Sequence, residues 1–199
     1  MKTLTEIGQL ALSSETTLRA TYGIARMLIQ QGVPGDFVEC GVFAGSQVAA
    51  MALAIVEADE KGRKIHLFDS FIGIPKAGPK DNIIRPLVGG TNGELVTSGV
   101  SACSSADVRE YMRDWGVPPD LLVYHEGWFQ ETVPVSGIDS IALLRLDGDL
   151  YESTLVCLQH LYPKLSKGGW CIADDYGLDG CREAVNQFLA DAPIYWVKG

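Results

Sequence analysis

Four aspartates stand directly after two apolar runs late in the chain, and carboxylates gathered in this way can hold a cation or accept a proton. The runs are Ile141–Leu146 and Trp170–Ala173, and residues 152–165 between them have a helical period. Unbroken apolar runs are typical of strands buried on both faces. We therefore expect a strand–helix–strand crossover with parallel strands. The four acidic residues are Asp147, Asp149, Asp174 and Asp175.

These carboxylates are expected at the same edge of the sheet, because adjacent strands lie roughly 4.8 Å apart. They would repel one another, and Arg145 is the one basic residue nearby in the sequence. A hard divalent cation such as magnesium is the natural counterion. Singly, Asp149 could cap the following helix and Asp174 could be a solvated turn residue. Their convergence where open α/β sheets bind ligands favours a functional site.

Composition limits the class of protein. The chain has 199 residues, is 47% hydrophobic and carries a formal net charge of −9. This suits one globular domain over residues 1–199 and argues against nucleic acid as a partner. No basic start with an apolar core and no stretch of ~20 apolar residues is found, so we expect a cytoplasmic protein without a membrane span. Five cysteines without a CxxC pair indicate neither zinc nor a disulfide framework.

The periodicity predicts six strands and a helical N-terminus. Residues 1–34 hold two helices, Thr3–Ser13 and Glu15–Gln31, which we expect to cover the ligand edge of the sheet or a partner subunit. Residues 73–100 are rich in turn-forming types and predict a mobile lid loop that contacts the substrate. The predicted strands are Asp36–Cys40, Lys64–Phe68, Asp120–Tyr124, Ile141–Leu146, Trp170–Ala173 and Ile194–Val197.

A glycine turn after the first strand predicts a nucleotide-binding edge. Gly41 and Gly45 would let the backbone approach a ligand, and the helix Gln47–Ala58 would leave its N-terminus open to a polar group. A tight turn without a ligand is the alternative. Asp69, which ends the second strand, is placed to bind ribose hydroxyls, although a turn residue also fits. Glu39 could bind ligand hydroxyls or an ammonium group.

The third predicted strand is followed by two further candidates. His125 could be a catalytic base, but a histidine beside an apolar run is more often structural. Trp128 and Phe129 could form the floor of an adenine pocket, or they could belong to the core.

Six segments, taken in order, resemble one family, the macrocin O-methyltransferase (TylF-like) group of S-adenosylmethionine- and metal-dependent sugar O-methyltransferases. The resemblance covers nearly the whole chain. The segments are VECGVFAGSQ (38–47), LFDSFIGIP (67–75), GWFQETVP (127–134), LLRLDGDLYEST (143–154), LYPKLSKGGWCIADDYG (161–177) and GCREAVNQF (180–188).

The resemblance implies a class I methyltransferase (Rossmann-like) fold, a three-layer α/β sandwich with a mostly parallel sheet of order 3-2-1-4-5-6. It implies a magnesium or manganese ion held by Asp147, Asp174 and Asp175, with Asp149 as general base. His125, from its place after the third predicted strand, is the alternative base. The acceptor would be a small-molecule hydroxyl, on a sugar of a natural product, and we expect a homodimer or larger assembly. S-adenosylmethionine would contact Glu39, Cys40, Gly41, Val42, Gly45, Ser46, Asp69, Ser70, Phe71, Gly127, Trp128, Phe129 and Asp147.

Two other functions use the same acidic residues or the same fold. A haloacid-dehalogenase-like phosphatase would use Asp147 as the nucleophile, but its D-x-D motif stands near the start of that fold and not on a fourth strand. A non-catalytic subunit that binds S-adenosylmethionine would have no need of the aspartate cluster.

Overall fold

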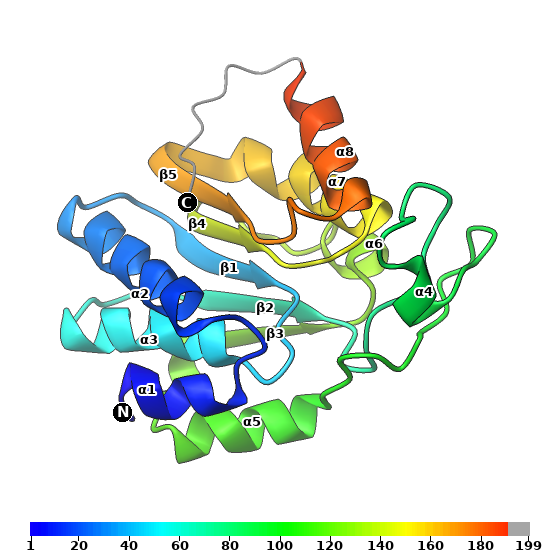
Figure 1. Cartoon of the computed structure of the whole chain (residues 1–199). Helices are drawn as coiled ribbons and strands as arrows, with labels where there is room; N and C mark the ends of the chain where they lie inside the picture. Colours follow the sequence, from blue (N-terminus) through cyan, green and yellow to red (C-terminus); the bar gives the residue numbers. More distant parts are fainter. Residues whose placement is uncertain (191–199) are drawn as a thin grey trace.

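The computed structural model describes residues 1–190, which form a parallel β-sheet with helices on both faces (Figure 1). The strand order is β3-β2-β1-β4-β5, and all four neighbouring pairs are parallel. This confirms the predicted order for five strands, whereas the predicted sixth strand, Ile194–Val197, lies outside the described residues. The strands are β1 (Asp36–Cys40), β2 (Ile65–Asp69), β3 (Leu122–Glu126), β4 (Ile141–Leu146) and β5 (Leu165–Ala173).

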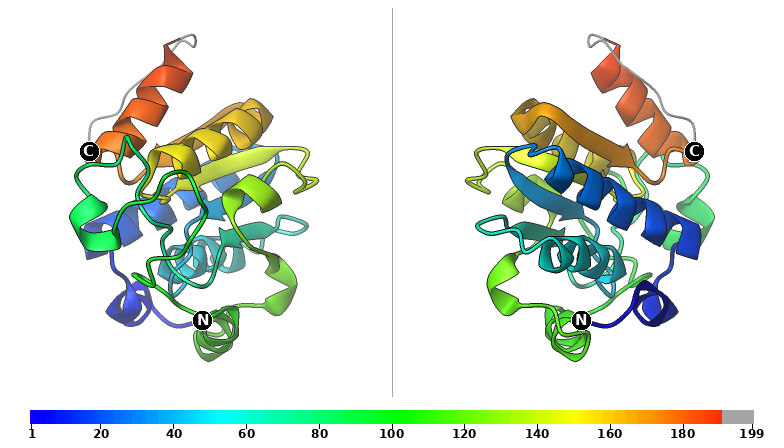
Figure 2. Two further views of the ribbon diagram at one scale, coloured as in Figure 1. Left: turned by 90° about the vertical axis from the view of Figure 1, so that its right-hand side faces the viewer. Right: turned by 90° about the vertical axis from the view of Figure 1, so that its left-hand side faces the viewer.

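The helices form the two outer layers of the sandwich (Figure 2). Helices α1, α2, α3 and α5 pack on one face of the sheet, and α6, α7 and α8 pack on the other. Among residues 1–190, no helix is long and apolar enough to cross a membrane. The helices are α1 (Leu4–Ile7), α2 (Glu15–Gln30), α3 (Ser46–Glu57), α4 (Arg85–Val88), α5 (Ser105–Asp114), α6 (Phe129–Thr132), α7 (Tyr151–Leu161) and α8 (Asp179–Leu189).

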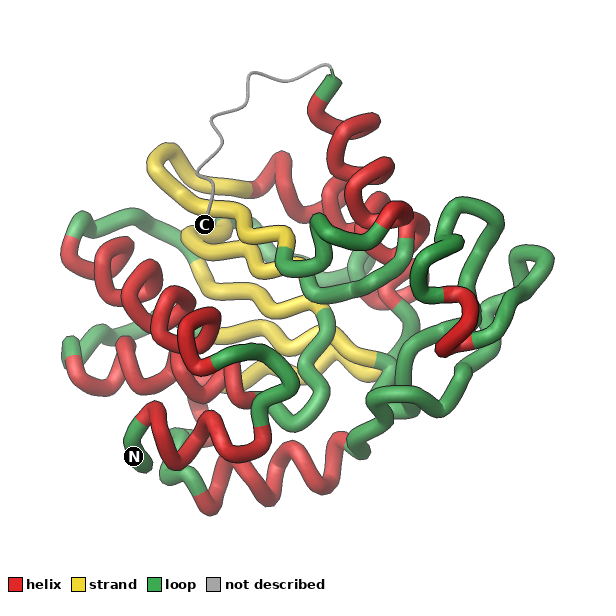
Figure 3. The backbone as a smooth tube through the Cα atoms, in the orientation of Figure 1, coloured by secondary structure: helices red, strands yellow, loops and turns green. Residues whose placement is uncertain are grey.

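The central strands explain why the sheet needs cover on both sides. All six residues of β4 are buried, and on β1 the side chains of Phe37 and Val38 enter the two opposite apolar cores. Alternate residues of a strand point to opposite faces, so a strand buried at every position requires a layer on each side. The loops that follow the strands gather at the carboxyl edge of the sheet (Figure 3).

Two predicted helix boundaries were wrong. The first helix ends at Ile7 and continues only as a 3₁₀ turn to Leu10, because the chain turns extended at Ala11. The predicted helix 152–165 ends at Leu161, since a 3₁₀ turn with a proline follows and β5 begins at Leu165. The glycine pair after it lies in an irregular part of β5, where the register with β4 shifts and Gly168 has φ +86°.

The segment 73–100 is held to the helices behind it at its middle. Asp81 accepts hydrogen bonds from the backbone N–H of Gly78 and of Tyr151, the first residue of α7, at 2.9 and 2.7 Å. Asp179, the first residue of α8, accepts from the backbone N–H of Asn82 and Ile83. The proposal that this segment is a lid therefore applies to the parts on either side of these anchors.

Candidate functional site

A cavity of about 300 Å³ opens at the carboxyl edge of the sheet, a volume at the lower end of the range for ligand pockets. Its walls come from the N-terminal segment, the glycine turn, the ends of β1, β2, β4 and β5, and the start of segment 73–100. The sequence-predicted residues that line it are Glu39, Gly41, Val42, Ser46, Asp69, Ser70, Trp128, Phe129, Asp147, Asp149, Asp174 and Asp175.

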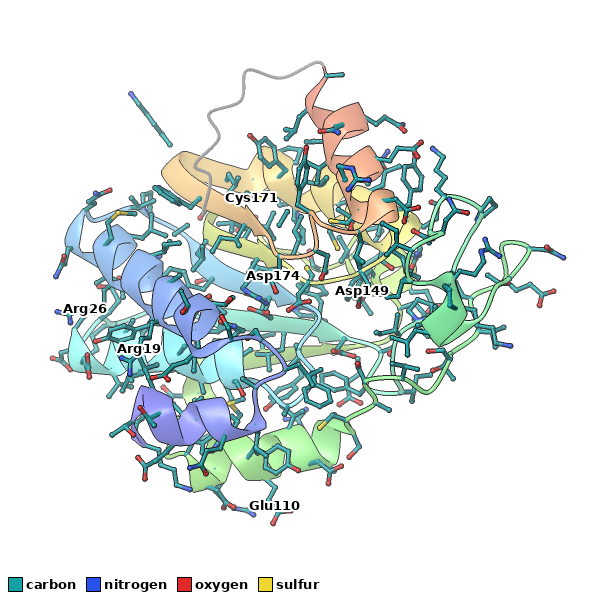
Figure 4. All side chains as sticks on the ribbon, in the orientation of Figure 1. Arg19, Arg26, Glu110, Asp149, Cys171 and Asp174 are labelled. Atoms are coloured by element: carbon teal, nitrogen blue, oxygen red, sulfur yellow. The ribbon has the colours of Figure 1, made fainter. Side chains whose placement is uncertain are left out.

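The predicted acidic cluster is present in this cavity. Asp147, Asp174 and Asp175 each offer a carboxylate oxygen, and these oxygens lie within 4.8 Å of one another. Asp149 and Asp174 both lie at the carboxyl edge of the sheet (Figure 4). The backbone N–H of Asp149 donates to Oδ2 of Asp175 at 2.9 Å, and Asp149 has φ +59°, a conformation unusual for a residue with a side chain. Together, Asp147, Asp174 and Asp175 supply the all-oxygen ligands that magnesium prefers.

A buried arginine holds this cluster from inside the sheet. The side chain of Arg145 is fully buried, and its Nη1 contacts Oε1 of Glu39 at 2.5 Å and Oδ2 of Asp147 at 2.8 Å. Its Nη2 lies 2.8 Å from Oδ2 of Asp174. Sequence reasoning identified Arg145 as the nearby cation but missed its link to Glu39, which is its register partner on β1.

Burial and mutual repulsion disfavour the charged state of these acids. Burial raises the pKa of Glu39 to about 8 against the opposing effect of Arg145. It also raises the pKa of Asp149 to about 7 and that of Asp175 to about 8, and neighbouring carboxylates add to both shifts. The pKa of Asp147 is raised by burial as well. One guanidinium does not balance this many carboxylates, so the donor set fits an added cation.

The two glycines of the turn make room for neighbouring parts of the protein, a reason for glycine that the sequence did not indicate. A Cβ on Gly41 would lie 1.7 Å from the backbone oxygen of Asp147. A Cβ on Gly45 would lie 2.1 Å from Cε of Met112 in α5. Both glycines also have positive φ, 94° and 86°, which favours glycine over other residues. The turn is therefore fixed by close packing against β4 and α5.

Asp69 shapes the same turn. Its Oδ2 accepts hydrogen bonds from the backbone N–H of Val42 and Phe43 at 2.6 and 3.1 Å, and its Oδ1 accepts from Phe71 N–H at 2.8 Å. From the sequence, Asp69 was expected to bind ribose hydroxyls or to serve as a turn residue. In the structure its carboxylate lines the cavity and also connects the ends of β1 and β2.

Five predicted site residues do not line the cavity. Cys40 lies in the core under α7, and Phe71 packs against Tyr124 in the opposite core. The backbone N–H of Gly127 donates to the carbonyl of Asp69. The remaining two are Gly45, described above, and His125.

His125 lies inside β3 and not after it, because the strand begins two residues later than predicted. Its ring stacks on Phe68 with 4.0 Å between centroids, and its Nε2 lies 3.0 Å from Nδ1 of His66. Burial, followed by the nearby His66, lowers the pKa of His125 to about 4. Asp149, which lines the cavity, is therefore the remaining candidate for the base.

The sequence did not indicate five polar residues that line the cavity, namely Ser13, Gln47, Ser101, Gln130 and Ser153. Gln47 in the first turn of α3 lines it, and its Nε2 donates to Oγ of Ser13 at 2.7 Å. Ser13 belongs to the N-terminal segment, which joins the cavity wall through Ala11, Leu12 and Ser13. No short motif in the sequence indicated that these two distant segments meet.

The family model described as macrocin-O-methyltransferase (TylF) matches residues 11–195. The chain belongs to this family. The sheet order and the layers are those of the class I methyltransferase fold, as the resemblance implied. A solved structure, that of the O-methyltransferase NovP, superposes with a TM-score of 0.80 at 34% identity and covers 92% of this chain and 74% of that one.

Curated relatives of the chain are named as O-methyltransferases of natural products. The chain is 38% identical to demethyldecarbamoylnovobiocin O-methyltransferase of Streptomyces niveus over 84% of its length, and covers 63% of that protein. It is 35% identical to 8-demethyl-8-(2,3-dimethoxy-alpha-L-rhamnosyl)-tetracenomycin-C 4'-O-methyltransferase of Streptomyces olivaceus over 81% of its length, and covers 60% of it. The chain thus spans about three fifths of the length of these relatives.

Proposed function

We propose that the protein transfers a methyl group from S-adenosylmethionine to a hydroxyl of a small molecule, a sugar of a natural product, with the help of magnesium or manganese. The observation that carries this proposal is that a glycine turn and an aspartate cluster line one and the same cavity. Membership of the TylF family supports it. The same membership sets aside the phosphatase alternative, in which the glycine turn would have no role.

In this proposal the cofactor lies along the ends of β1 and β2. The turn Gly41–Ser46 is near the methionine end, and Asp69 receives the ribose hydroxyls in addition to its backbone hydrogen bonds. Trp128 and Phe129 offer aromatic surface to the adenine, since both line the cavity. The methyl group would then lie toward the aspartate cluster.

Asp147, Asp174 and Asp175 would hold the metal ion, and the ion when bound makes an acceptor hydroxyl easier to deprotonate. Asp149 lines the cavity beside these three residues and is outside the set whose oxygens gather within 4.8 Å. Its carboxylate can therefore receive the hydroxyl proton. Burial of Asp149 in the cavity raises its pKa, which favours acceptance of a proton by this carboxylate.

A methyl-transfer assay tests the proposal. The protein is incubated with S-adenosylmethionine labelled in the methyl group and with a panel of deoxysugar glycosides and catechols, with magnesium or with excess chelator. We expect labelled product from at least one glycoside, lost in chelator and restored by magnesium or manganese. Full turnover after chelation would exclude a metal requirement. Binding of the cofactor without methyl transfer to any acceptor would favour a non-catalytic subunit.

We further propose a cytoplasmic homodimer or larger homo-oligomer. The amphipathic helix α2 near the N-terminus favours an assembly, because exposed apolar surface prefers to be covered. Light scattering at micromolar concentration would show a mass of at least two chains, and the mass of one chain would contradict the proposal.

A further inference from the structure

Gln47 lines the cavity and has no part in the chemistry proposed above. It lies in the first turn of α3, and its side chain reaches Ser13 in the N-terminal segment. Only 7% of the residue is exposed, and its Oε1 is buried without a hydrogen-bond partner among the described residues. Buried acceptors are rarely left unpaired in native proteins, so an unpaired one in a cavity wall indicates a ligand that donates to it.

A second buried acceptor on the same cavity is also unpaired. Glu39 is 1% exposed, and Arg145 holds its Oε1 at 2.5 Å. Its Oε2 has no hydrogen-bond partner among residues 1–190. Arg145 therefore orients the carboxylate from inside the sheet and leaves its Oε2 without a partner.

Two unpaired acceptors on one cavity fit a ligand group with several donors and no acceptor. A primary ammonium has three N–H donors, whereas a hydroxyl has one. A neutral amide is also the better second acceptor here, because another carboxylate would add repulsion to a cavity already lined by six acidic side chains, Glu39, Asp69, Asp147, Asp149, Asp174 and Asp175.

We propose that Oε1 of Gln47 and Oε2 of Glu39 together accept hydrogen bonds from the α-ammonium group of S-adenosylmethionine. Gln47 is then a cofactor-binding residue, and Ser13 is a positioning residue that holds its amide. This inference rests on the proposed function and deepens it. It also gives the N-terminal segment a role in cofactor binding, since Ser13 is part of that segment.

The competing arrangement is a reversed amide. Because Ser13 carries a hydroxyl, it could donate to Oε1 and leave Nε2 facing the cavity, where an amide N–H would suit the carboxylate of the cofactor. The two arrangements bind opposite ends of the same amino-acid group. They are separated by ligands that keep only one of those ends.

Calorimetric titration of Gln47→Ala and the unchanged protein with three ligands tests the proposal. S-adenosylmethionine has both the ammonium and the carboxylate, its decarboxylated form keeps only the ammonium, and 5′-methylthioadenosine has neither. We expect the substitution to weaken the first two about tenfold, as for a hydrogen bond to a charged group, and the third by less than about twofold. Gln47→Met, which keeps the length of the side chain, should behave in the same way.

Two outcomes would overturn the proposal. An equal loss for all three ligands would mean that Gln47 only shapes the cavity. A loss with S-adenosylmethionine that disappears with its decarboxylated form would mean that the amide binds the carboxylate. Ser14→Ala is the control for the N-terminal segment and should leave all three affinities unchanged, because Ser14 is exposed and its Oγ accepts from Thr17 N–H in α2. Failure of the unchanged protein to bind any of the three ligands would instead overturn the proposed function itself.

Discussion

Arg145 and Glu39 form an ion pair inside the sheet, with 2.5 Å between Nη1 and Oε1 and at most 1% of either side chain exposed. Although burial alone would lower the pKa of Arg145, Glu39 and the aspartates raise it, so the guanidinium stays charged. The pair connects the proposed ammonium acceptor on β1 with two proposed metal ligands. It is the structural centre of the site.

Arg145→Met is expected to lower the free energy of unfolding by about 3–5 kcal/mol, because it leaves Glu39 buried without a counterion. Urea denaturation measures the change. The control is Arg19→Met on the surface of α2, where Arg19 and Glu15 form an exposed pair at 2.6 Å and the loss should be below about 1 kcal/mol. Similar small losses for both variants would contradict a structural role for the buried pair.

Asp149→Asn keeps the shape of the side chain and removes the base. Turnover should fall by roughly 10²–10⁴-fold, while cofactor and metal affinities stay within a few-fold. Single-turnover kinetics together with calorimetry separate these quantities. His125→Ala is the comparison, since its ring lies outside the cavity, and it should leave the chemical step nearly unchanged. Near-normal turnover of Asp149→Asn would remove this residue from the mechanism.

Asp175→Asn should have opposite effects on the metal and on the metal-free fold. Loss of one oxygen ligand should weaken Mn²⁺ binding by at least about tenfold. Without metal the protein should be as stable as before or more so, because the pKa of Asp175, raised to about 8 by burial and its acidic neighbours, shows that its charge is disfavoured there. Paramagnetic titration and thermal melts in chelator measure the two effects. Unchanged Mn²⁺ affinity would exclude Asp175 as a ligand.

Asp69→Ala should affect both binding and stability. Three backbone N–H groups, those of Val42, Phe43 and Phe71, would lose their acceptor, so the free energy of unfolding should fall by about 1–3 kcal/mol. The dissociation constant for S-adenosylmethionine should rise at least about tenfold. A loss of stability with unchanged cofactor affinity would leave Asp69 with a structural role alone.

The lowered pKa of His125 leads us to expect that the free energy of unfolding depends on pH. The pKa of His125 is about 4 in the folded protein, through burial and then His66, against about 6.5 when unfolded. Between pH 4 and 6.5 the unfolded chain binds one proton more at this histidine than the folded protein does. The stability that comes from keeping His125 neutral is therefore fully present above pH ~6.5 and is lost as pH falls toward 4. The groups in contact with it are Phe68 and His66, and His66 pairs with Asp36.

His125→Phe should keep the stack on Phe68 and reduce that slope. Urea denaturation of both proteins at several pH values between 4 and 7 gives the difference, in which other titrating groups cancel. Parallel curves for the two proteins would contradict a buried neutral His125.

Much of the site could be predicted because local patterns carry it. Apolar runs that end in acids located β4, the end of β5 and the aspartate cluster, since parallel strands bring their carboxyl ends together. The first five residues of β5, 165–169, were not predicted as strand. The order strand, glycine, helix located the turn at Gly41, because all three parts are adjacent in the sequence. The family resemblance then suggested S-adenosylmethionine as the cofactor, which no spacing alone could identify.

The remainder depends on contacts between distant segments. Glycine is favoured at position 45 because a side chain there would meet Met112 in α5. The hydrogen-bond partner of Gln47 is Ser13 in the N-terminal segment. Neither contact has a local pattern in the sequence. His125 was misplaced because a 3₁₀ turn, Pro119–Leu121, delays the start of β3. Tertiary packing decided each of these cases.

The most direct test of the central claim is a calorimetric titration of the unmodified protein with S-adenosylmethionine, with and without magnesium. The account predicts saturable binding of one cofactor per chain, and binding of Mn²⁺ that is lost in Asp174→Asn. Absence of cofactor binding at about 1 mM ligand, where even a free energy near −4 kcal/mol would be detected, would contradict it.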